Sequence, residues 1–310
     1  MDRRTFAQNI AGTVAAACGL LAPAMLSAEA MSAANRLTDP PFQLSVMLWT
    51  VFRDLPFEER LEKIAEAGYR NLELVGEYSR WTEDDFRRIN AKRKELGITF
   101  DATAGLKHSL CNPQERVGFL SELRDALPVM EKLDCPSMII LSGDVVPGLA
   151  PEAHHQSCID TLKAGVELVQ GKSIHGRPVQ LLLETIDPLE NPNVYLTHID
   201  EALRIVEAVN HPQVKLLYDF FHEQIAAGNL IAKIEKAMPH LALVHIADVP
   251  GRHEPGTGEI NYETILRRLT EPNYTGMVAM EFLPTGDDPV VKLRAAREMA
   301  LRVARDSHLR

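Results

Sequence analysis

The chain has 310 residues, of which 45% are hydrophobic and 25% are charged, a composition typical of a soluble globular protein with a full hydrophobic core. Its 33 basic and 43 acidic residues give a net charge of -10 at pH 7, and the charges are spread along the chain. Nucleic acid and anionic membranes both require a basic face, so this charge argues against either as the main partner. The four cysteines form no CxxC pair, which excludes a zinc ribbon or a disulfide-dense scaffold. An enzyme or a small-molecule binder remains.

Residues 1–30 are predicted to be an export signal of the twin-arginine type. Arg3 and Arg4 precede a mildly apolar, alanine-rich stretch that ends in small residues near Ala30. A charged start, an apolar middle and a small-residue end are typical of secretory signals, and adjacent arginines favour the twin-arginine route. Crossing a bilayer takes about 20 strongly apolar residues, and glycine and proline interrupt this stretch, so a membrane anchor is the less favoured alternative. We expect an exported, periplasmic protein with residues 31–41 as a short linker.

Three cysteines follow the predicted signal, namely Cys111, Cys135 and Cys158. In an oxidising compartment, cysteines that lie close together form disulfides. Since three is an odd number, at least one of these cysteines is left without a partner in the same chain. We therefore expect at least one buried free thiol in the folded protein.

From residue 42 onward, short apolar runs alternate with amphipathic stretches. Eight runs are predicted to be strands: Leu44–Trp49, Asn71–Val75, Ile98–Ala104, Met138–Ser142, Val179–Thr185, Val214–Phe220, Leu241–Ala247 and Met277–Phe282. Several are apolar on both faces, as in parallel strands covered by helices. The predicted helices between them include Glu58–Ala67, Glu83–Leu96, Pro113–Leu133, Glu152–Val169, Ile199–Val209 and Val290–Arg305. This alternation predicts one (β/α)8 TIM barrel over residues 42–310, and a doubly wound sheet is disfavoured because no GxGxxG turn follows the first strand.

Polar residues interrupt the apolar runs of the last four predicted strands. Glu184 ends LLLE, Asp219 ends LLYD, His245 lies in LVHI and Glu281 ends VAME. A buried carboxylate is costly unless it is paired or binds a metal, and for any one of these residues a strand-end salt bridge is an equally good interpretation. The carboxyl ends of barrel strands meet at one mouth, however, which favours one shared site. Three carboxylates and one imidazole suit one divalent ion, and the sequence does not choose among Mn²⁺, Mg²⁺, Co²⁺ and Zn²⁺.

Two further residues are predicted to reach the same mouth. His222 follows the sixth predicted strand, and Arg252 lies in the glycine- and proline-rich turn at 248–259. Long structured loops at this face usually serve function, and an arginine there could hold a substrate hydroxyl or carboxylate. A surface histidine and a salt bridge within the loop are the alternatives. Asp101 and the pair His154–His155 are predicted to be ordinary solvated or capping residues.

The segments around these residues resemble the hydroxypyruvate isomerase family, within the xylose isomerase-like group of TIM barrels. The most specific match is residues 245–262, which read HIADVPGRHEPGTGEINY. The resemblance continues through residues 218–224, the strand that contains Glu184, and residues 280–284. It extends from the first predicted strand to the last predicted helix, so it covers nearly all of the chain that follows the signal.

The resemblance implies a metal-dependent enzyme with four ligands, which are Glu184, Asp219, His245 and Glu281. Glu184 and Glu281 are also implied to form the acid/base pair. His222 and Arg252 are implied to contact the substrate. A metal that bridges a carbonyl and its neighbouring hydroxyl makes the intervening C–H acidic, so one glutamate can take that proton to give an enediolate. Return of the proton to the adjacent carbon is aldose–ketose isomerisation, an intramolecular oxidation and reduction.

The reaction that this resemblance implies is the conversion of hydroxypyruvate to tartronate semialdehyde. The histidine at position 245 and the segment 104–116 depart from those isomerases, which keeps a ketose 3-epimerase and a 3-keto-glycoside-processing lyase as alternatives. A metal-containing sugar-binding barrel is the non-enzymatic alternative. The expected partner is a small hydroxy-carbonyl or sugar substrate. Neither nucleic acid binding nor a stable membrane span is expected, and the sequence leaves homo-oligomer formation open.

Overall fold

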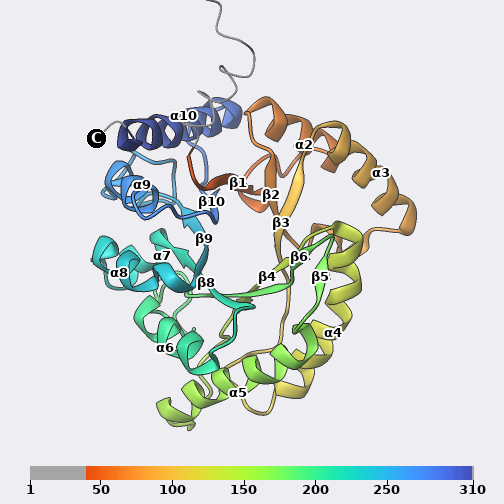
Figure 1. The fold of residues 1–310 in the computed structure, drawn as a ribbon, viewed down its shortest axis with the longest axis vertical. Coiled ribbons are helices and arrows are strands. Elements are labelled where there is room, and N and C mark those ends of the chain that lie inside the picture. The colour runs from red at the N-terminus through yellow and green to blue at the C-terminus, as the bar shows by residue number, and fades with distance from the viewer. Residues whose placement is uncertain (1–39, 309–310) are drawn as a thin grey trace, which may run out of the picture. The chain divides into compact units, whose positions relative to one another are not determined.

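The computed structural model describes residues 40–308. They form a closed barrel of parallel strands in the order β1-β10-β9-β8-β7-β4-β3-β2, and the helices form an outer layer around it (Figure 1). The predicted (β/α)8 TIM barrel is therefore confirmed, and the closure excludes a doubly wound sheet. The predicted signal at residues 1–30 and the linker up to residue 39 lie outside the described residues. Within residues 40–308, no helix is both long and apolar enough to cross a membrane.

All eight predicted strands are present, and their ends agree with the prediction to within two residues. The barrel strands are β1 (Gln43–Met47), β2 (Asn71–Val75), β3 (Thr99–Ala104), β4 (Ser137–Leu141), β7 (Gln180–Glu184), β8 (Val214–Asp219), β9 (Leu241–Ile246) and β10 (Met277–Met280). Glu281 therefore lies just past its strand rather than inside it. A small antiparallel hairpin, which the sequence did not predict, precedes β7 and consists of β5 (Ser173–Ile174) and β6 (Arg177–Pro178).

The helices that cover the barrel are α2 (Phe57–Glu66), α3 (Glu83–Glu95), α4 (Arg116–Leu133), α5 (Pro151–Val169), α6 (Ile199–Val209), α7 (Phe220–Ala226), α8 (Leu230–Ala237), α9 (Tyr262–Thr270) and α10 (Pro289–His308). Short 3-10 turns occur at Leu48–Thr50, Glu77–Arg80 and Met238–His240. The predicted helix start at Pro113 is wrong. Asn112 accepts hydrogen bonds from the backbone N–H groups of Gln114 and Glu115, which makes a turn and delays the helix to Arg116.

The strands alternate between two apolar layers. In β7, Leu181 and Leu183 belong to the large core between strands and helices, whereas Leu182 belongs to a smaller cluster inside the barrel. Successive side chains of a strand point to opposite faces, so a residue two positions beyond an inner one also points inward. Leu182, Leu217, Leu243 and Ala279 are all inner residues. The residues two positions later are Glu184, Asp219, His245 and Glu281, and the fold therefore turns all four toward the barrel interior.

The three cysteines within the described residues are all buried and unpaired. At least one buried free thiol was expected, and that expectation is confirmed. Burial is the largest influence on each thiol, and it raises the pKa of Cys111, Cys135 and Cys158. The thiolate is the reactive form, so burial and the raised pKa both make these residues unreactive.

We predict that protein starting at residue 31 will show no rapid thiol reaction while it is folded. A chromogenic disulfide reagent should titrate all three cysteines only after denaturation. The measurement is the absorbance change with and without guanidinium, and rapid reaction of any thiol in the native protein would contradict the described burial.

Candidate functional site

Four side chains from neighbouring strands meet at the carboxyl end of the barrel. They are Glu184, Asp219, His245 and Glu281, and one ligand atom from each lies within 4.8 Å of all the others. The His245 Nδ1 atom is 2.7 Å from Glu281 Oε2, 3.6 Å from Glu184 Oε1 and 3.9 Å from Asp219 Oδ2. All four residues are buried. The structure thus brings together the four residues that the sequence singled out as metal ligands.

Unsatisfied polar atoms test whether this group fits a metal ion. Asp219 Oδ2, His245 Nδ1 and Glu281 Oε2 are buried and make no well-directed hydrogen bond among the described residues, although His245 Nδ1 and Arg252 lie within ion-pair distance of Glu281 Oε2. A buried polar atom without a partner is costly, and a divalent cation would satisfy all three at once. Carboxylate oxygens with one imidazole nitrogen suit Mn²⁺, Mg²⁺, Co²⁺ or Zn²⁺. The residues therefore fit one divalent ion without selecting among these metals.

The charged groups of the site shift the pKa values of Glu184 and Glu281 in opposite directions. Burial, reinforced by the charges of Glu281 and Asp219, raises the pKa of Glu184. Burial acts the same way on Glu281, but the charges of His245 and Arg252 outweigh it and hold the Glu281 pKa well below its usual value. Burial opposes a charged His245, yet the carboxylates around it raise its pKa well above the ordinary value. A proton and a metal ion therefore compete for His245 Nδ1.

Arg252 lies over the four ligands rather than in a salt bridge within its own loop. Its guanidinium is 2.9 Å from Glu281 Oε2 and 3.1 Å from Glu190 Oε2. The same group lies 5.3 Å from the ring centroid of Trp49 and 4.8 Å from that of Phe221. Aromatic faces stabilise a cation in this position. Arg252 is thus held at the mouth, where its donors can reach a substrate oxygen.

Asp248 fixes the loop that presents Arg252. This carboxylate is fully buried and accepts hydrogen bonds from the backbone N–H groups of Val249, Gly256, Gly258 and Ile260. Gly258 is required because a Cβ atom there would lie 2.0 Å from the carbonyl oxygen of Val249. Arg252 itself has a φ of 57°, a left-handed conformation that non-glycine residues adopt only where the surroundings enforce it. The loop geometry therefore determines where the guanidinium lies.

Glu254 ties the same loop to the segment that follows β10. Its carboxylate accepts a hydrogen bond of 2.9 Å from the backbone N–H of Thr285 and lies 2.7 Å from Lys292 Nζ. Burial alone would raise the pKa of Glu254, but the bonds from Lys292 and Thr285 lower it to about 2. The ionised form of Glu254 therefore stabilises the folded loop.

His222 is buried at the mouth and is not a surface histidine. Its Nδ1 atom lies 2.6 Å from Asp187 Oδ2, and its Nε2 atom lies 3.4 Å from Asp219 Oδ2. Burial disfavours the charged ring, but the Asp219 charge and the Asp187 hydrogen bond raise the pKa of His222 to about 9. The raised pKa favours the positively charged form of His222, whose ring N–H groups can donate hydrogen bonds near the candidate metal ligands.

The sequence interpretation missed several residues that complete the site. The Trp49 indole N–H donates to Glu281 Oε1 over 2.8 Å, and Glu73 Oε2 lies 2.8 Å from His245 Nε2. Asp187 and Glu190 hold His222 and Arg252, as described above. Glu73 carried the same signal as the predicted ligands, because it interrupts the apolar run NLELV. The roles of Trp49, Asp187 and Glu190 depend on contacts between distant segments, and no local pattern marks them.

The prediction that Asp101 and His154 are solvated or capping residues is wrong. Asp101 is buried and accepts a hydrogen bond of 2.8 Å from Ser45 Oγ. A register shift between β2 and β3 leaves Asp101 without a partner residue in β2, which is a bulge that redirects a side chain. His154 is also buried, and its Nε2 atom accepts a hydrogen bond of 2.8 Å from the Val146 N–H.

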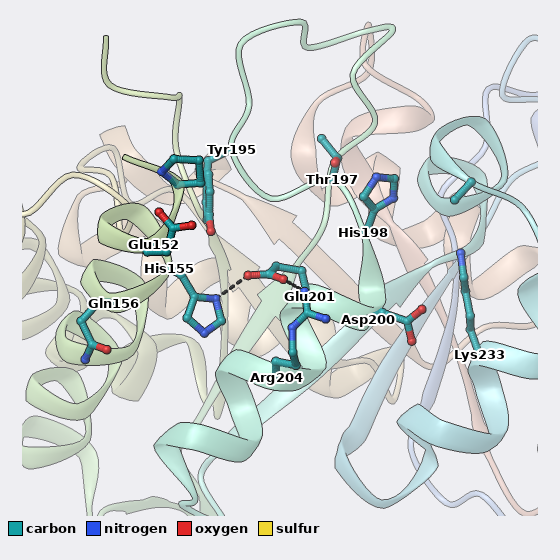
Figure 2. Close-up of a pocket in the computed structure, with 12 residues that line it drawn as sticks. Glu152, His155, Gln156, Tyr195, Thr197, His198, Asp200, Glu201, Arg204 and Lys233 are labelled. Atoms are coloured by element: carbon teal, nitrogen blue, oxygen red, sulfur yellow. Dashed lines mark hydrogen bonds and ion pairs between the residues drawn. The ribbon is translucent and has the colours of Figure 1, made fainter. Parts of the chain in front are cut away.

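A separate cavity of about 830 Å³ lies among α5, α6 and α8 (Figure 2). His155 is on its wall and pairs with Glu201, which also pairs with Arg204. Lys233, at the α8 side, pairs with the buried carboxylate of Glu223. Each of these basic groups already has an acidic partner in the cavity or beneath it. The basic groups named here are therefore already neutralised by neighbouring carboxylates.

Comparisons with known proteins agree with this architecture. Residues 61–302 match the family described as xylose isomerase-like TIM barrel. A 2-oxo-tetronate isomerase of Pectobacterium atrosepticum is 30% identical over 240 residues, which cover 76% of this chain and 90% of the relative. The hydroxypyruvate isomerase of Escherichia coli is 27% identical over 248 residues, covering 78% and 93% of the two chains. A crystal structure described as an AP endonuclease, family 2, from Brucella melitensis aligns with a TM-score of 0.71 and 28% identity over 83% of this chain and 96% of that one.

We predict that Glu254→Gln will weaken the acid sensitivity of the fold. The pKa of Glu254 in the folded protein is about 2, below the ordinary value of 4.5, so its contribution is present above about pH 5 and is lost as the pH falls toward about 2. The wild-type free energy of unfolding should fall over this range by on the order of 2 kcal/mol more than that of the variant. Urea denaturation of chelator-treated protein at several pH values measures this, with the exposed Glu259→Gln as the control. Equal pH dependence in wild type and Glu254→Gln would refute the prediction.

Proposed function

The chain belongs to the xylose isomerase-like TIM barrel family, and from this membership we propose that it is a metal-dependent isomerase of small hydroxy-carbonyl compounds. Relatives of 30% and 27% identity are named 2-oxo-tetronate isomerase and hydroxypyruvate isomerase, which supports an isomerase. The finer assignment is aldose–ketose isomerisation, in which one carbon is oxidised and its neighbour is reduced within the same molecule.

The convergence of unsatisfied ligand atoms carries this proposal. Asp219 Oδ2, His245 Nδ1 and Glu281 Oε2 are buried together with no hydrogen-bond partner among residues 40–308. His245 and Arg252 compensate part of the carboxylate charge, and a divalent cation among these atoms would compensate the rest. Glu184 completes the group from β7. We infer that these four residues hold one divalent metal ion, which can be Mn²⁺, Mg²⁺, Co²⁺ or Zn²⁺.

The proposed reaction uses the chain's residues as follows. A bound divalent ion supplies the Lewis acidity that makes the C–H beside a substrate carbonyl acidic. Glu281 takes this proton, since Trp49 and Arg252 hold its carboxylate in one orientation. Glu184, whose pKa is raised by burial, is protonated and gives its proton to the neighbouring carbon, while the substrate hydroxyl proton passes to the former carbonyl oxygen; exchange with water then returns both glutamates to their starting states. His222 and Arg252 donate hydrogen bonds to substrate oxygens and so stabilise the charge of an enediolate.

We propose hydroxypyruvate and related 2-oxo acids as the substrates. Hydroxypyruvate and 2-oxo-tetronate both carry a ketone next to a hydroxylated carbon, which is the unit that this chemistry requires. Ketose 3-epimerisation is the second candidate. The observation in its favour is the pair of glutamates on separated strands, since epimerisation needs proton removal on one face and return on the other.

The protein is further proposed to work after export to the periplasm by the twin-arginine route. The support is the sequence alone, in which Arg3 and Arg4 precede an apolar stretch and a small-residue end. The partner in this proposal is a small-molecule substrate, and the net charge of -10 disfavours nucleic acid.

We predict that Glu184→Gln and Glu281→Gln will each reduce kcat by at least about 10³-fold with little change in the melting temperature, because the amide cannot exchange the substrate proton. The control is Glu263→Gln, an exposed residue of α9 whose carboxylate pairs with Arg302, away from the barrel mouth. Proton NMR in D₂O measures turnover and deuterium uptake, and circular dichroism measures the melting temperature. Near-normal turnover in either active-site variant would refute its proton-transfer role.

The same NMR assay tests the substrate proposal. Metal-loaded protein is given hydroxypyruvate, 2-oxo-tetronate, ketohexoses and 3-keto-glucosides, each with and without a chelator. Chelator-sensitive conversion of a 2-oxo acid supports the proposed function. Conversion of a ketohexose to its 3-epimer, with both 2-oxo acids unchanged, supports the second candidate. No conversion of any compound by metal-loaded protein would refute both.

A further inference from the structure

We propose that Glu73 is a positioning residue that fixes the orientation and the protonated nitrogen of His245 for metal binding. This inference rests on the metal site of the proposed function and adds a residue that does not contact the ion. Glu73 lies in β2, whereas His245 lies in β9, and β1 and β10 separate these strands in the barrel. The contact therefore spans the barrel interior beneath the site.

The two nitrogens of His245 face different partners. Nε2 lies 2.8 Å from Glu73 Oε2, and both residues are completely or almost completely buried. Nδ1 faces the other way, toward Glu281 Oε2 at 2.7 Å and Asp219 Oδ2 at 3.9 Å. Only one ring nitrogen therefore points to the metal ligands, and the other points to Glu73.

The Glu73 carboxylate selects one state of the neutral imidazole. An ionised carboxylate can accept a hydrogen bond but cannot donate one. Glu73 therefore places the ring proton of a neutral His245 on Nε2. The lone pair of Nδ1 is then directed at the metal position, as metal binding by histidine requires. An adjacent negative charge also makes the imidazole a stronger donor to a cation. Glu73 would thus contribute to metal affinity from behind the ligand.

The burial of the Glu73 carboxylate is costly for folding, which favours a role in positioning His245 over a role in stability. Its side chain is fully buried, and Oε1 has no hydrogen-bond partner among the described residues. An apolar side chain of similar volume would avoid this desolvation cost. The contact with His245 Nε2 is the only side-chain hydrogen bond that Glu73 makes within residues 40–308.

Asp101 provides a matched control on the neighbouring strand. Like Glu73, it is a buried carboxylate with one oxygen that has no partner in the described part of the chain. Its other oxygen accepts a hydrogen bond from Ser45 and makes no contact with a metal ligand. A general effect of removing a buried charge would appear in both residues, whereas a positioning effect would appear only in Glu73.

The experiment measures Mn²⁺ affinity by isothermal titration calorimetry for the wild type, Glu73→Gln, Glu73→Met and Asp101→Asn. Glu73→Gln removes the charge but keeps an acceptor, and Glu73→Met removes both. We expect the dissociation constant to rise about 10-fold in Glu73→Gln and toward 100-fold in Glu73→Met. Asp101→Asn should retain the wild-type affinity. Melting curves confirm that each variant is folded before titration.

A spectroscopic readout separates positioning from a general loss of structure. In Zn²⁺-loaded wild type, ¹⁵N NMR of labelled histidine should show His245 protonated at Nε2 and metal-bound at Nδ1. In Glu73→Met this signature should weaken or split between the two nitrogens, while the other histidine signals keep their shifts.

The outcomes distinguish the two proposals. If the wild type binds no divalent metal, both the metal site and this inference are overturned. If both Glu73 variants bind Mn²⁺ as tightly as the wild type does, the metal site stands and only the role of Glu73 is overturned. An equal loss of affinity in Asp101→Asn would likewise overturn that role, because buried charge in general would then be the cause.

Discussion

The mutual repulsion of carboxylates at one end of the barrel is the constraint on which the rest of the site depends. Glu184, Asp219 and Glu281 are buried within a few ångströms of one another, where water cannot screen their charges. These three carboxylates can stay ionised together only if positive charge lies among them. His245 and Arg252 supply part of that charge. The aromatic rings and loop contacts around Arg252 follow from the need to keep a cation fixed over the ligands.

The sequence predicted the barrel and the convergence of Glu184, Asp219, His245 and Glu281 because local patterns indicate both. Eight apolar runs that alternate with amphipathic stretches leave few architectures open, and strand ends in a parallel barrel meet at one mouth. The inward direction of Glu184 follows from its spacing of two residues from Leu182, an inner-layer residue. His222 and Arg252 could be placed at the mouth because each lies just beyond a strand that bears a ligand.

Other features could not be predicted, since they depend on which distant segments the closed barrel brings together. Trp49 contacts Glu281 across 232 positions of sequence, and Glu73 contacts His245 across 172. Asp101 was misjudged because its inward placement comes from a bulge in the pairing of β2 with β3. The local sequence pattern does not indicate such a bulge, because the bulge depends on how two strands pair. The substrate belongs to the same class of problem, because its recognition depends on loops from several strands.

The four candidate metal ligands come from one arc of the barrel, formed by β7, β8, β9 and the end of β10. The strands of the opposite arc end in Met47, Val75, Ala104 and Leu141, none of which is a carboxylate or a histidine. The loops at residues 105–115 and 142–150 continue from that arc. Duplicated copies of such a gene could therefore diverge in substrate through changes on one side, while the chemistry on the other side stayed intact. Because Trp49 and Glu73 on the opposite arc contact Glu281 and His245, the freedom to vary lies in these loops and not in the strands beneath them, and it lets one barrel serve as a starting point for related enzymes.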